Sequence, residues 1–314
     1  MALKITKAEE VIEIKQLCTT IYSQPGLGKT SLAFTASRPL LLDFDKGAYR
    51  AVDRGDVVQV ESWADVAQIT PADLQDYDTI ILDTVGKALD FLAADILEKQ
   101  PKMGWGGALN QQGWGQLNVK FRGFLSSLKK HGKDIVLIAH MDEKADGDGI
   151  KERLKIQGGS KDLVLTDSDM IGRISVYNGQ RVLMFSPTET SFGKDPASFV
   201  SRPIPDASSA EYKTFLNDIL TGTKEALNSL SEAQVARKSE VEWFTATLPS
   251  ITDLDAINEL LGRAKKAGAD VSRMVVKRAE ELGGEFDPES RAYVYLEQMQ
   301  PTNPEENISE PEAA

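Results

Sequence analysis

Residues 23–30 read SQPGLGKT and match the phosphate-loop pattern G-x-x-x-x-G-K-[ST] at every fixed position except the first, where Ser23 replaces glycine. The glycines let backbone N–H groups approach phosphate oxygens, the lysine reaches the β- and γ-phosphates, and the threonine hydroxyl ligates magnesium. Some backbone conformations at the first position accept serine. The stretch therefore predicts that ATP and Mg²⁺ bind at Gly26, Leu27, Gly28, Lys29, Thr30 and Ser31. The alternative is a glycine-rich turn between a strand and a helix that binds no ligand.

The sequence around this loop alternates between apolar runs typical of buried strands and longer helical stretches. The runs are LCTTIYSQPG (17–26), RPLLLDFDKG (38–47), YDTIILDTVG (77–86) and GKDIVLIAHMDE (132–143). The helical stretches are VGKALDFLAADILEK (85–99) and GQLNVKFRGFLSSLKK (115–130). Such alternation predicts an α/β fold with a mostly parallel sheet between helices. A hairpin around Asn178-Gly179 is expected to add two further strands.

Polar side chains punctuate the ends of these runs, at Asp43, Asp45, Asp83 and His140. In parallel sheets ligands bind beyond the carboxyl ends of the strands, so these side chains are expected at one site.

Asp83 is predicted to hold the magnesium, and its alternative role is to cap the helix beginning near Val85. One of Asp43 and Asp45 is predicted to position the attacking water, and the alternative is an ordinary acidic strand end. His140 is expected to contact the γ-phosphate, although a purely structural histidine fits the same pattern.

Two glycine-rich loops offer groups that suit nucleic acid. Residues 101–116 carry Trp105 and Trp114 among glycines, and exposed aromatic rings stack on unpaired bases. Residues 143–161 carry bases suited to a phosphate backbone, namely Lys144, Lys151, Arg153, Lys155 and Lys161. The alternatives are tryptophans that anchor their loop on the core, and charges offset by the neighbouring acids.

The composition and net charge of the chain limit the classes of function that it can have. The 314 residues carry a net charge of −12, which opposes non-specific attraction to nucleic acid but leaves room for a local basic groove. One cysteine, Cys18, allows no internal disulfide, and the two histidines are too few for a Cys/His metal site. We expect no secretion signal and no membrane span, and a reducing cytoplasm fits the single cysteine.

Changes in composition and hydrophobic pattern along the chain predict three regions: a core over residues 1–205, a helical region over 206–300, and a disordered acidic tail over 301–314. Within the helical region short helices are expected. One would begin at a capping box at Thr252–Asp255, and another would be capped by Asp270 and end at Gly283-Gly284.

Taken together, SQPGLGKT, LLLDFD, IILDT and VLIAH resemble the RecA-like P-loop ATPases. IYSQPGLGKTSLA, LLLDFDKGA and QGGSKDLVLTDSDMIGRI look like the phage-encoded nucleotide-binding proteins of the Sak recombination group. The resemblance implies that Asp45 takes the place of the catalytic glutamate and His140 that of the polar sensor. It also implies that residues 101–115 and 142–160 are DNA-binding loops, and that the active form is a homo-oligomer, either a ring or a filament.

One departure concerns the group that acts on a neighbouring subunit's nucleotide. The family often has a lysine and an arginine before a Phe-Gly or Asn-Gly pair, whereas Glu189 and Ser191 stand at those places in ETSFGK. Lys194 is the remaining basic candidate for that catalytic role. Aspartate at position 45 is also shorter than the family's glutamate.

These observations predict a DNA-stimulated ATPase that binds single-stranded DNA and promotes annealing or strand exchange. The alternatives are an ATP-gated annealing or recruitment scaffold that does not hydrolyse ATP, a helicase loader, and a P-loop kinase. A kinase needs a lid with several arginines, which the loop around Arg153 lacks. The helical region and its acidic tail suit a protein partner such as a single-strand binding protein.

Overall fold

The computed structural model describes residues 3, 5–7, 10–146 and 149–295, and it divides into two compact units. One unit is Glu13–Ser229, and the other joins Leu230–Ala314 with Met1–Ile12. The acidic tail predicted over 301–314 lies outside the described residues. Among the helices of the described residues, none is both long and apolar enough to span a bilayer.

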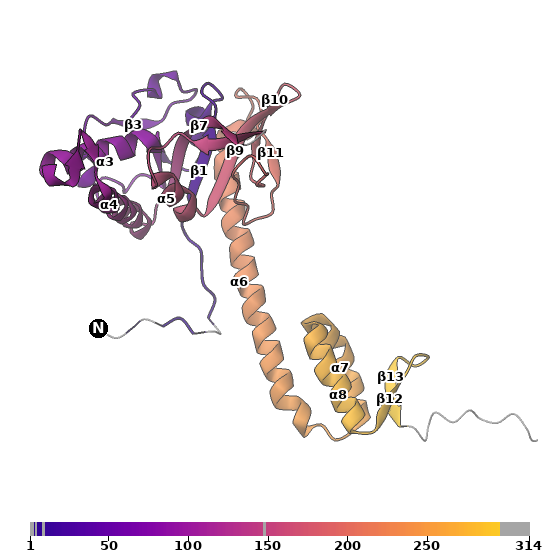
Figure 1. Ribbon diagram of the computed structural model, residues 1–314. Helices are drawn as coiled ribbons and strands as arrows, with labels where there is room; N and C mark the ends of the chain where they lie inside the picture. The colour runs from indigo at the N-terminus through magenta and orange to yellow at the C-terminus, as the bar shows by residue number, and fades with distance from the viewer. Residues whose placement is uncertain (1–2, 4, 8–9, 147–148, 296–314) are drawn as a thin grey trace, which may run out of the picture. The chain divides into compact units, whose positions relative to one another are not determined.

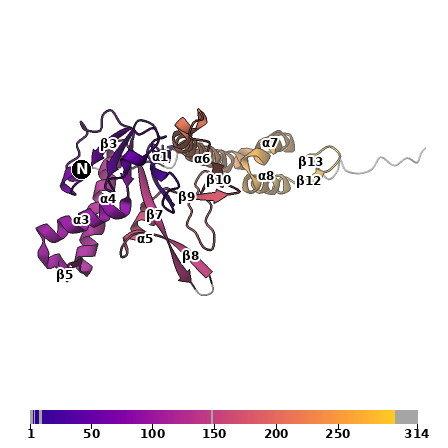
Figure 2. The same ribbon diagram turned by 90° about the horizontal axis from the view of Figure 1, so that it is seen from above.

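The first unit is built on a nine-stranded sheet in the order β11-β10-β9-β1-β7-β4-β2-β3, with β8 paired to β7 (Figures 1 and 2). The run from β9 to β3 is parallel, while β10, β11 and β8 add antiparallel pairs. The strands are β1 (Cys18–Ser23), β2 (Pro39–Asp43), β3 (Asp56–Gln59), β4 (Thr79–Asp83), β7 (Asp134–Asp146), β8 (Gly149–Leu154), β9 (Met170–Tyr177), β10 (Gln180–Met184) and β11 (Ser201–Pro203). A separate two-stranded hairpin joins β5 (Gly104–Trp105) and β6 (Ala108–Leu109).

Helices cover both faces of this sheet because alternate residues of each strand point to opposite sides. Leu40, Ile80 and Leu137 face one core, and Leu41, Ile81 and Val136 face the other. The first core is closed by α2 (Ala64–Ala67), α3 (Val85–Lys99), α4 (Gln111–Lys130) and α5 (Ser160–Asp167), with α3 and α4 side by side (Figure 1). The second is closed by α1 (Lys29–Ala33) and the first half of α6 (Phe215–Thr247).

The predicted fold class is confirmed: a mostly parallel sheet lies between helices, and a helical region follows. The helix predicted over 85–99 has those bounds, and the hairpin at Asn178-Gly179 pairs Tyr177 with Gln180. The first half of α6 packs on the sheet through Leu216, Ile219 and Leu220. The compact unit consequently ends at Ser229, further along the chain than the boundary predicted at residue 205.

The second unit contains the end of α6, α7 (Leu254–Ala267), α8 (Ala269–Glu281) and a hairpin of β12 (Gly284–Asp287) and β13 (Ala292–Tyr295). Two expectations need correction. Short helices were expected after residue 206, but α6 is one helix of 33 residues. Asp270 does not cap α8, because Gly268 holds the cap position and the Asp270 carboxylate pairs with Arg237 instead. Helix α7 begins within the predicted Thr252–Asp255 stretch, but its cap is Asp253, which accepts from Ala256 N, and not Thr252.

Asp134 ties the start of the central strands to α6. Its buried carboxylate accepts from Leu17 N at 2.8 Å and pairs with Lys224 Nζ at 2.5 Å. Replacement by alanine leaves a buried N–H and an ammonium group without their acceptor.

We expect Asp134→Ala to lower the free energy of unfolding by about 3 kcal/mol. Asp134→Asn keeps an acceptor for Leu17 N, so it should cost less. Urea denaturation followed by circular dichroism measures both variants. Equal losses would contradict the assigned role of the Leu17 bond.

Candidate functional site

The loop at residues 24–28 connects β1 to α1 and depends on two glycines in the left-handed region. Gly26 and Gly28 both have φ of +82°. A Cβ on Gly28 would lie 2.6 Å from Nη1 at the flexible end of the Arg181 side chain, so a substitution there would strain the backbone and displace Arg181. Ser23 is fully buried, and its hydroxyl donates to Gln24 O at 2.9 Å. Serine therefore fits the first position of the motif and bonds inside the loop.

Lys29 closes the loop from within. Its ammonium group donates to Ser23 O and Ser23 Oγ, each at 3.2 Å, and to Gln24 O at 3.0 Å. Only 6% of Lys29 is exposed. Since all three acceptors belong to the start of the loop, the Lys29 ammonium group lies on the inner side of the loop.

Thr30 and Asp83 place two oxygens together. The Thr30 hydroxyl donates to Asp83 Oδ2 at 2.5 Å, and Asp83 is 6% exposed at the end of β4. Mg²⁺ in nucleotide sites uses one or two protein oxygens together with phosphate oxygens. This hydroxyl and carboxylate fit that requirement, and they are the groups that would hold the ion. The alternative of Asp83 as a helix cap is not what the structure shows, because Thr84 caps α3 through Lys87 N.

The two acids at the end of β2 have different environments. Asp43 is 1% exposed and accepts from Gly47 N at 3.1 Å and Ala48 N at 3.0 Å, so it holds the turn after the strand. Asp45 is half-buried, and its Oδ2 lies 3.9 Å from His140 Nε2. Of the two, Asp45 is the carboxylate that faces the other site residues.

His140 lies at the junction of the sheet and the β7–β8 hairpin. It pairs in register with Ser23 of β1, and its carbonyl accepts from Lys155 N at 2.8 Å. In the part of the chain that the structure describes, its buried Nδ1 has no hydrogen-bond partner.

These groups line one cleft of about 780 Å³ at the carboxyl ends of β1, β2 and β4 and beside His140 in the middle of β7. The lining includes Gly26, Gly28, Lys29, Thr30, Ser31, Asp45, Arg50, Asp83, His140, Asp142 and Lys155. That volume lies within the usual range of about 300–1,000 Å³ for ligand sites. The edge of the sheet therefore gathers the predicted phosphate, metal and water-positioning groups around one space.

Burial shifts the titration of three of these groups. It lowers the pKa of Lys29 to about 8, against the opposing pull of Asp83 and Asp45. It raises the pKa of Asp83 to about 6, in spite of the Thr30 hydrogen bond that favours the charged form. Burial followed by the nearby Lys29 charge lowers the pKa of His140, so the ring is neutral at pH 7. A cleft that disfavours isolated charge is suited to a ligand that brings compensating charge.

The first glycine-rich loop places its two tryptophans differently. Trp105 is 87% exposed in the β5–β6 hairpin, next to Gly106 and Gly107. Trp114 belongs to the first turns of α4 and is packed against the core, and a Cβ on Gly158 would lie 3.2 Å from its ring. The expected exposed position is therefore wrong for Trp114, which instead joins the first loop to the end of the second.

The second loop is the β7–β8 hairpin, which extends past the sheet as a two-stranded ribbon (Figure 2). Lys151 and Arg153 share one face of β8, and Lys155 follows in the same alternation. The opposite face carries Glu152, whose carboxylate accepts from Arg173 at 2.6 Å, and buried Leu154. Lys161 lies apart on α5 and is half-buried. Lys144 is exposed on β7.

Lys194 lies away from the cleft of its own chain. Its ammonium group donates to Ser168 O at 2.6 Å, and its backbone bridges Ile171 near the start of β9. Because β9 is parallel to β1, this position is at the amino end of the strands, opposite the phosphate loop.

Two arginines that the sequence analysis did not single out approach the loop. Arg50 lines the cleft, and Arg181 Nη1 donates to Leu27 O at 3.2 Å. Neither belongs to a motif. Arg181 comes from β10, 154 positions along the chain from Leu27, so only the fold brings the two together.

A family model described as an AAA domain matches residues 15–197, which is more than half of the chain. The chain belongs to this AAA domain family. AAA domains are P-loop domains that bind nucleotide and are generally ATPases, in accord with the predicted loop. Among solved structures, one similar chain is the crystal structure of the RadB recombinase, at 13% identity. The match covers 54% of this chain and 79% of that chain with a TM-score of 0.34. No curated protein matches.

Asp83→Asn should stabilise the protein at neutral pH. The pKa of Asp83 is raised from 3.8 to about 6, so the folded state holds its proton more tightly than the unfolded state. Stability from this group is consequently present below pH 4 and lost as the pH rises to about 6.

At pH 7 we expect the free energy of unfolding of Asp83→Asn to exceed that of the unchanged protein by about 2 kcal/mol, with the difference vanishing near pH 3. Urea titrations at both pH values measure it. Asp45→Asn, at a half-exposed carboxylate, is the matched control and should change stability little. A destabilised Asp83→Asn at pH 7 would show that the carboxylate is not disfavoured by burial.

Proposed function

We propose that this AAA domain protein is a DNA-stimulated ATPase of the phage Sak recombination group. It would bind single-stranded DNA and promote annealing or strand exchange. The observation that carries the proposal is that the ATP cleft and the base of the β7–β8 hairpin share His140 and Lys155. Ring or filament assembly and a single-strand binding protein as partner belong to the same proposal.

In this proposal the loop amides of residues 26–31 and the Lys29 ammonium group bind the phosphates. Thr30 and Asp83 hold Mg²⁺, which neutralises phosphate charge when it is bound. Asp45 orients the attacking water, acting by position more than by basicity. The neutral ring of His140 forms a hydrogen bond with the γ-phosphate. Lys194 lies at the amino end of the strands, opposite the phosphate loop of its own chain. It would therefore act only on the nucleotide of a neighbouring subunit.

Single-stranded DNA would contact Trp105 by stacking, and Lys151, Arg153, Lys155 and Lys161 through its phosphates. Trp114 supports the DNA-binding surface from beneath, because its ring packs under Gly158. Occupancy of the cleft would move Lys155 through its bond to the His140 carbonyl, and DNA on the hairpin would in return affect the cleft.

Lys29→Ala should lose nucleotide binding and ATP turnover, because it removes the buried ammonium group that donates to Ser23 O and Gln24 O of the loop. Isothermal titration with MgATP and a phosphate-release assay, each with and without single-stranded DNA, measure the loss. Lys265→Ala, an exposed lysine in the other unit, is the matched control and should retain both. Turnover retained in Lys29→Ala would refute the assignment of the site.

Trp105→Ala should weaken binding of a labelled single-stranded oligonucleotide roughly tenfold, since base stacking contributes about 1–3 kcal/mol per base. Fluorescence anisotropy at two salt concentrations measures the effect, and affinity should fall with salt in both proteins. Tyr177→Ala removes another exposed aromatic, 71% accessible on the β9–β10 hairpin, and should have no effect. Equal affinities for Trp105→Ala and Tyr177→Ala would remove the first loop from the DNA site.

A second candidate is an ATP-gated scaffold that anneals DNA or recruits a partner without hydrolysis. It is favoured by the short Asp45 side chain, whose carboxylate faces His140 at 3.9 Å. DNA annealing that proceeds equally with a non-hydrolysable ATP analogue would support this candidate over the ATPase.

A further inference from the structure

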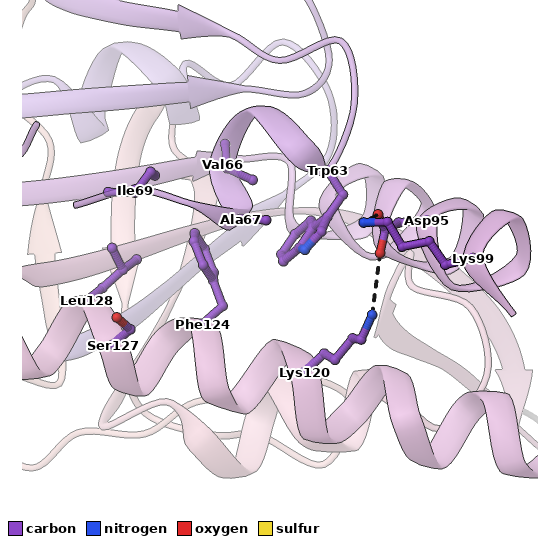
Figure 3. Close-up of a pocket in the computed structure, with 10 residues that line it drawn as sticks. All are labelled: Trp63, Val66, Ala67, Ile69, Asp95, Lys99, Lys120, Phe124, Ser127 and Leu128. Atoms are coloured by element: carbon purple, nitrogen blue, oxygen red, sulfur yellow. Dashed lines mark hydrogen bonds and ion pairs between the residues drawn. The ribbon is translucent and has the colours of Figure 1, made fainter.

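A second groove lies on the α2–α3–α4 side of the sheet and shares no lining residue with the ATP cleft among the described residues. We name it the Trp63 groove. It has a volume of about 270 Å³. Its lining consists of Trp63, Val66, Ala67, Ile69, Asp95, Lys99, Lys120, Phe124, Ser127 and Leu128 (Figure 3).

The floor of the Trp63 groove is apolar and rigid. Trp63 and Phe124 meet edge to face, with ring centroids 5.2 Å apart, and Trp63 also stacks on Phe44 of the core. Val66 and Leu128 are buried beside them. Because these side chains are fixed by the core, the groove is formed before any ligand arrives, which lowers the entropic cost of binding.

The mouth of the Trp63 groove carries surplus positive charge. Asp95, which is 8% exposed, is the only acid in the lining, and it pairs with both Lys99 and Lys120. The Lys120 contact is long, at 3.4 Å, and Figure 3 shows this lysine reaching across the opening. One carboxylate thus serves two ammonium groups, on a chain whose net charge is −12. An incoming carboxylate would find Lys120 available at little cost.

Size and charge together define the occupant. Small-molecule sites usually enclose about 300–1,000 Å³, and the groove is below that range. It is suited to one large apolar side chain, the kind of anchor that dominates protein interfaces. We propose that the Trp63 groove docks an acidic peptide segment of a partner protein, with one aromatic or large aliphatic side chain on Trp63 and Phe124 and carboxylates on Lys99 and Lys120.

The test uses the full chain and a short fluorescein-labelled peptide in which one phenylalanine is flanked by aspartates. Binding is followed by fluorescence anisotropy. We expect saturable binding that weakens at least tenfold when the peptide phenylalanine becomes alanine or its aspartates become asparagines. No saturable binding, or equal binding of the three peptides, would overturn the proposal.

Two variants localise the binding. Lys120→Glu should weaken it at least tenfold, whereas Lys130→Glu, the same charge change on an exposed part of α4 outside the groove, should leave it unchanged apart from a small general effect. Ser127→Phe fills the groove from an exposed position and should abolish binding without disturbing the core. Peptide binding that survives Ser127→Phe would place the peptide elsewhere.

Two further readouts separate this proposal from others. MgATP binding should be the same in Ser127→Phe and the unchanged protein, because the groove and the cleft are separate. Failure of the ATPase assignment would therefore leave this test intact. Sedimentation in which Ser127→Phe dissociates an oligomer would show that a second copy of this chain occupies the groove, and it would overturn the peptide proposal.

Discussion

The parallel pairing of β1, β7, β4 and β2 is the constraint on which the site depends. Parallel strands bring residues that are far apart in the sequence to the same edge of the sheet: Ser23 is in register with His140, and Asp43 with Asp83. Asp83 then meets Thr30 at 2.5 Å. No local motif could produce this meeting, because the phosphate loop supplies only the backbone amides, the lysine and the hydroxyl. The sheet supplies the acids and the imidazole.

Burial of the charged groups of Asp83 and Lys29 has an energetic cost that a bound ligand would offset. Asp83 and Lys29 are both almost inaccessible, and burial outweighs their mutual attraction in shifting the pKa of each toward the neutral form. Magnesium and phosphate would bring the opposite charges to the same place, so their binding would relieve this penalty. The two buried acids have different hydrogen-bond partners: Asp43 accepts from two backbone N–H groups, whereas Asp83 accepts from the Thr30 hydroxyl.

The elements predicted correctly from the sequence are those whose apolar residues all face a single core. The helix at 85–99 has one apolar face against one core and a cap at Thr84, so its bounds could be predicted from the sequence. The bounds of α6 were not predicted, because its early residues face the sheet, its late residues face the core of the second unit, and good helix formers without apolar periodicity join them. Arg181 carries no local signal, and Trp114 sits among glycines that resemble a loop although they begin α4.

The contacts of Lys155 would carry the proposed coupling between the cleft and the hairpin. Its N–H is bonded to His140 O, its side chain lines the cleft, and a Cβ on Gly86 would lie 2.9 Å from its carbonyl. The first turn of α3 and His140 of β7 therefore both lie against Lys155, the residue that follows β8. In the proposed mechanism, a shift of His140 toward or away from a phosphate would be passed to β8, since close-packed contacts transmit displacement. One face of β8 carries Lys151 and Arg153.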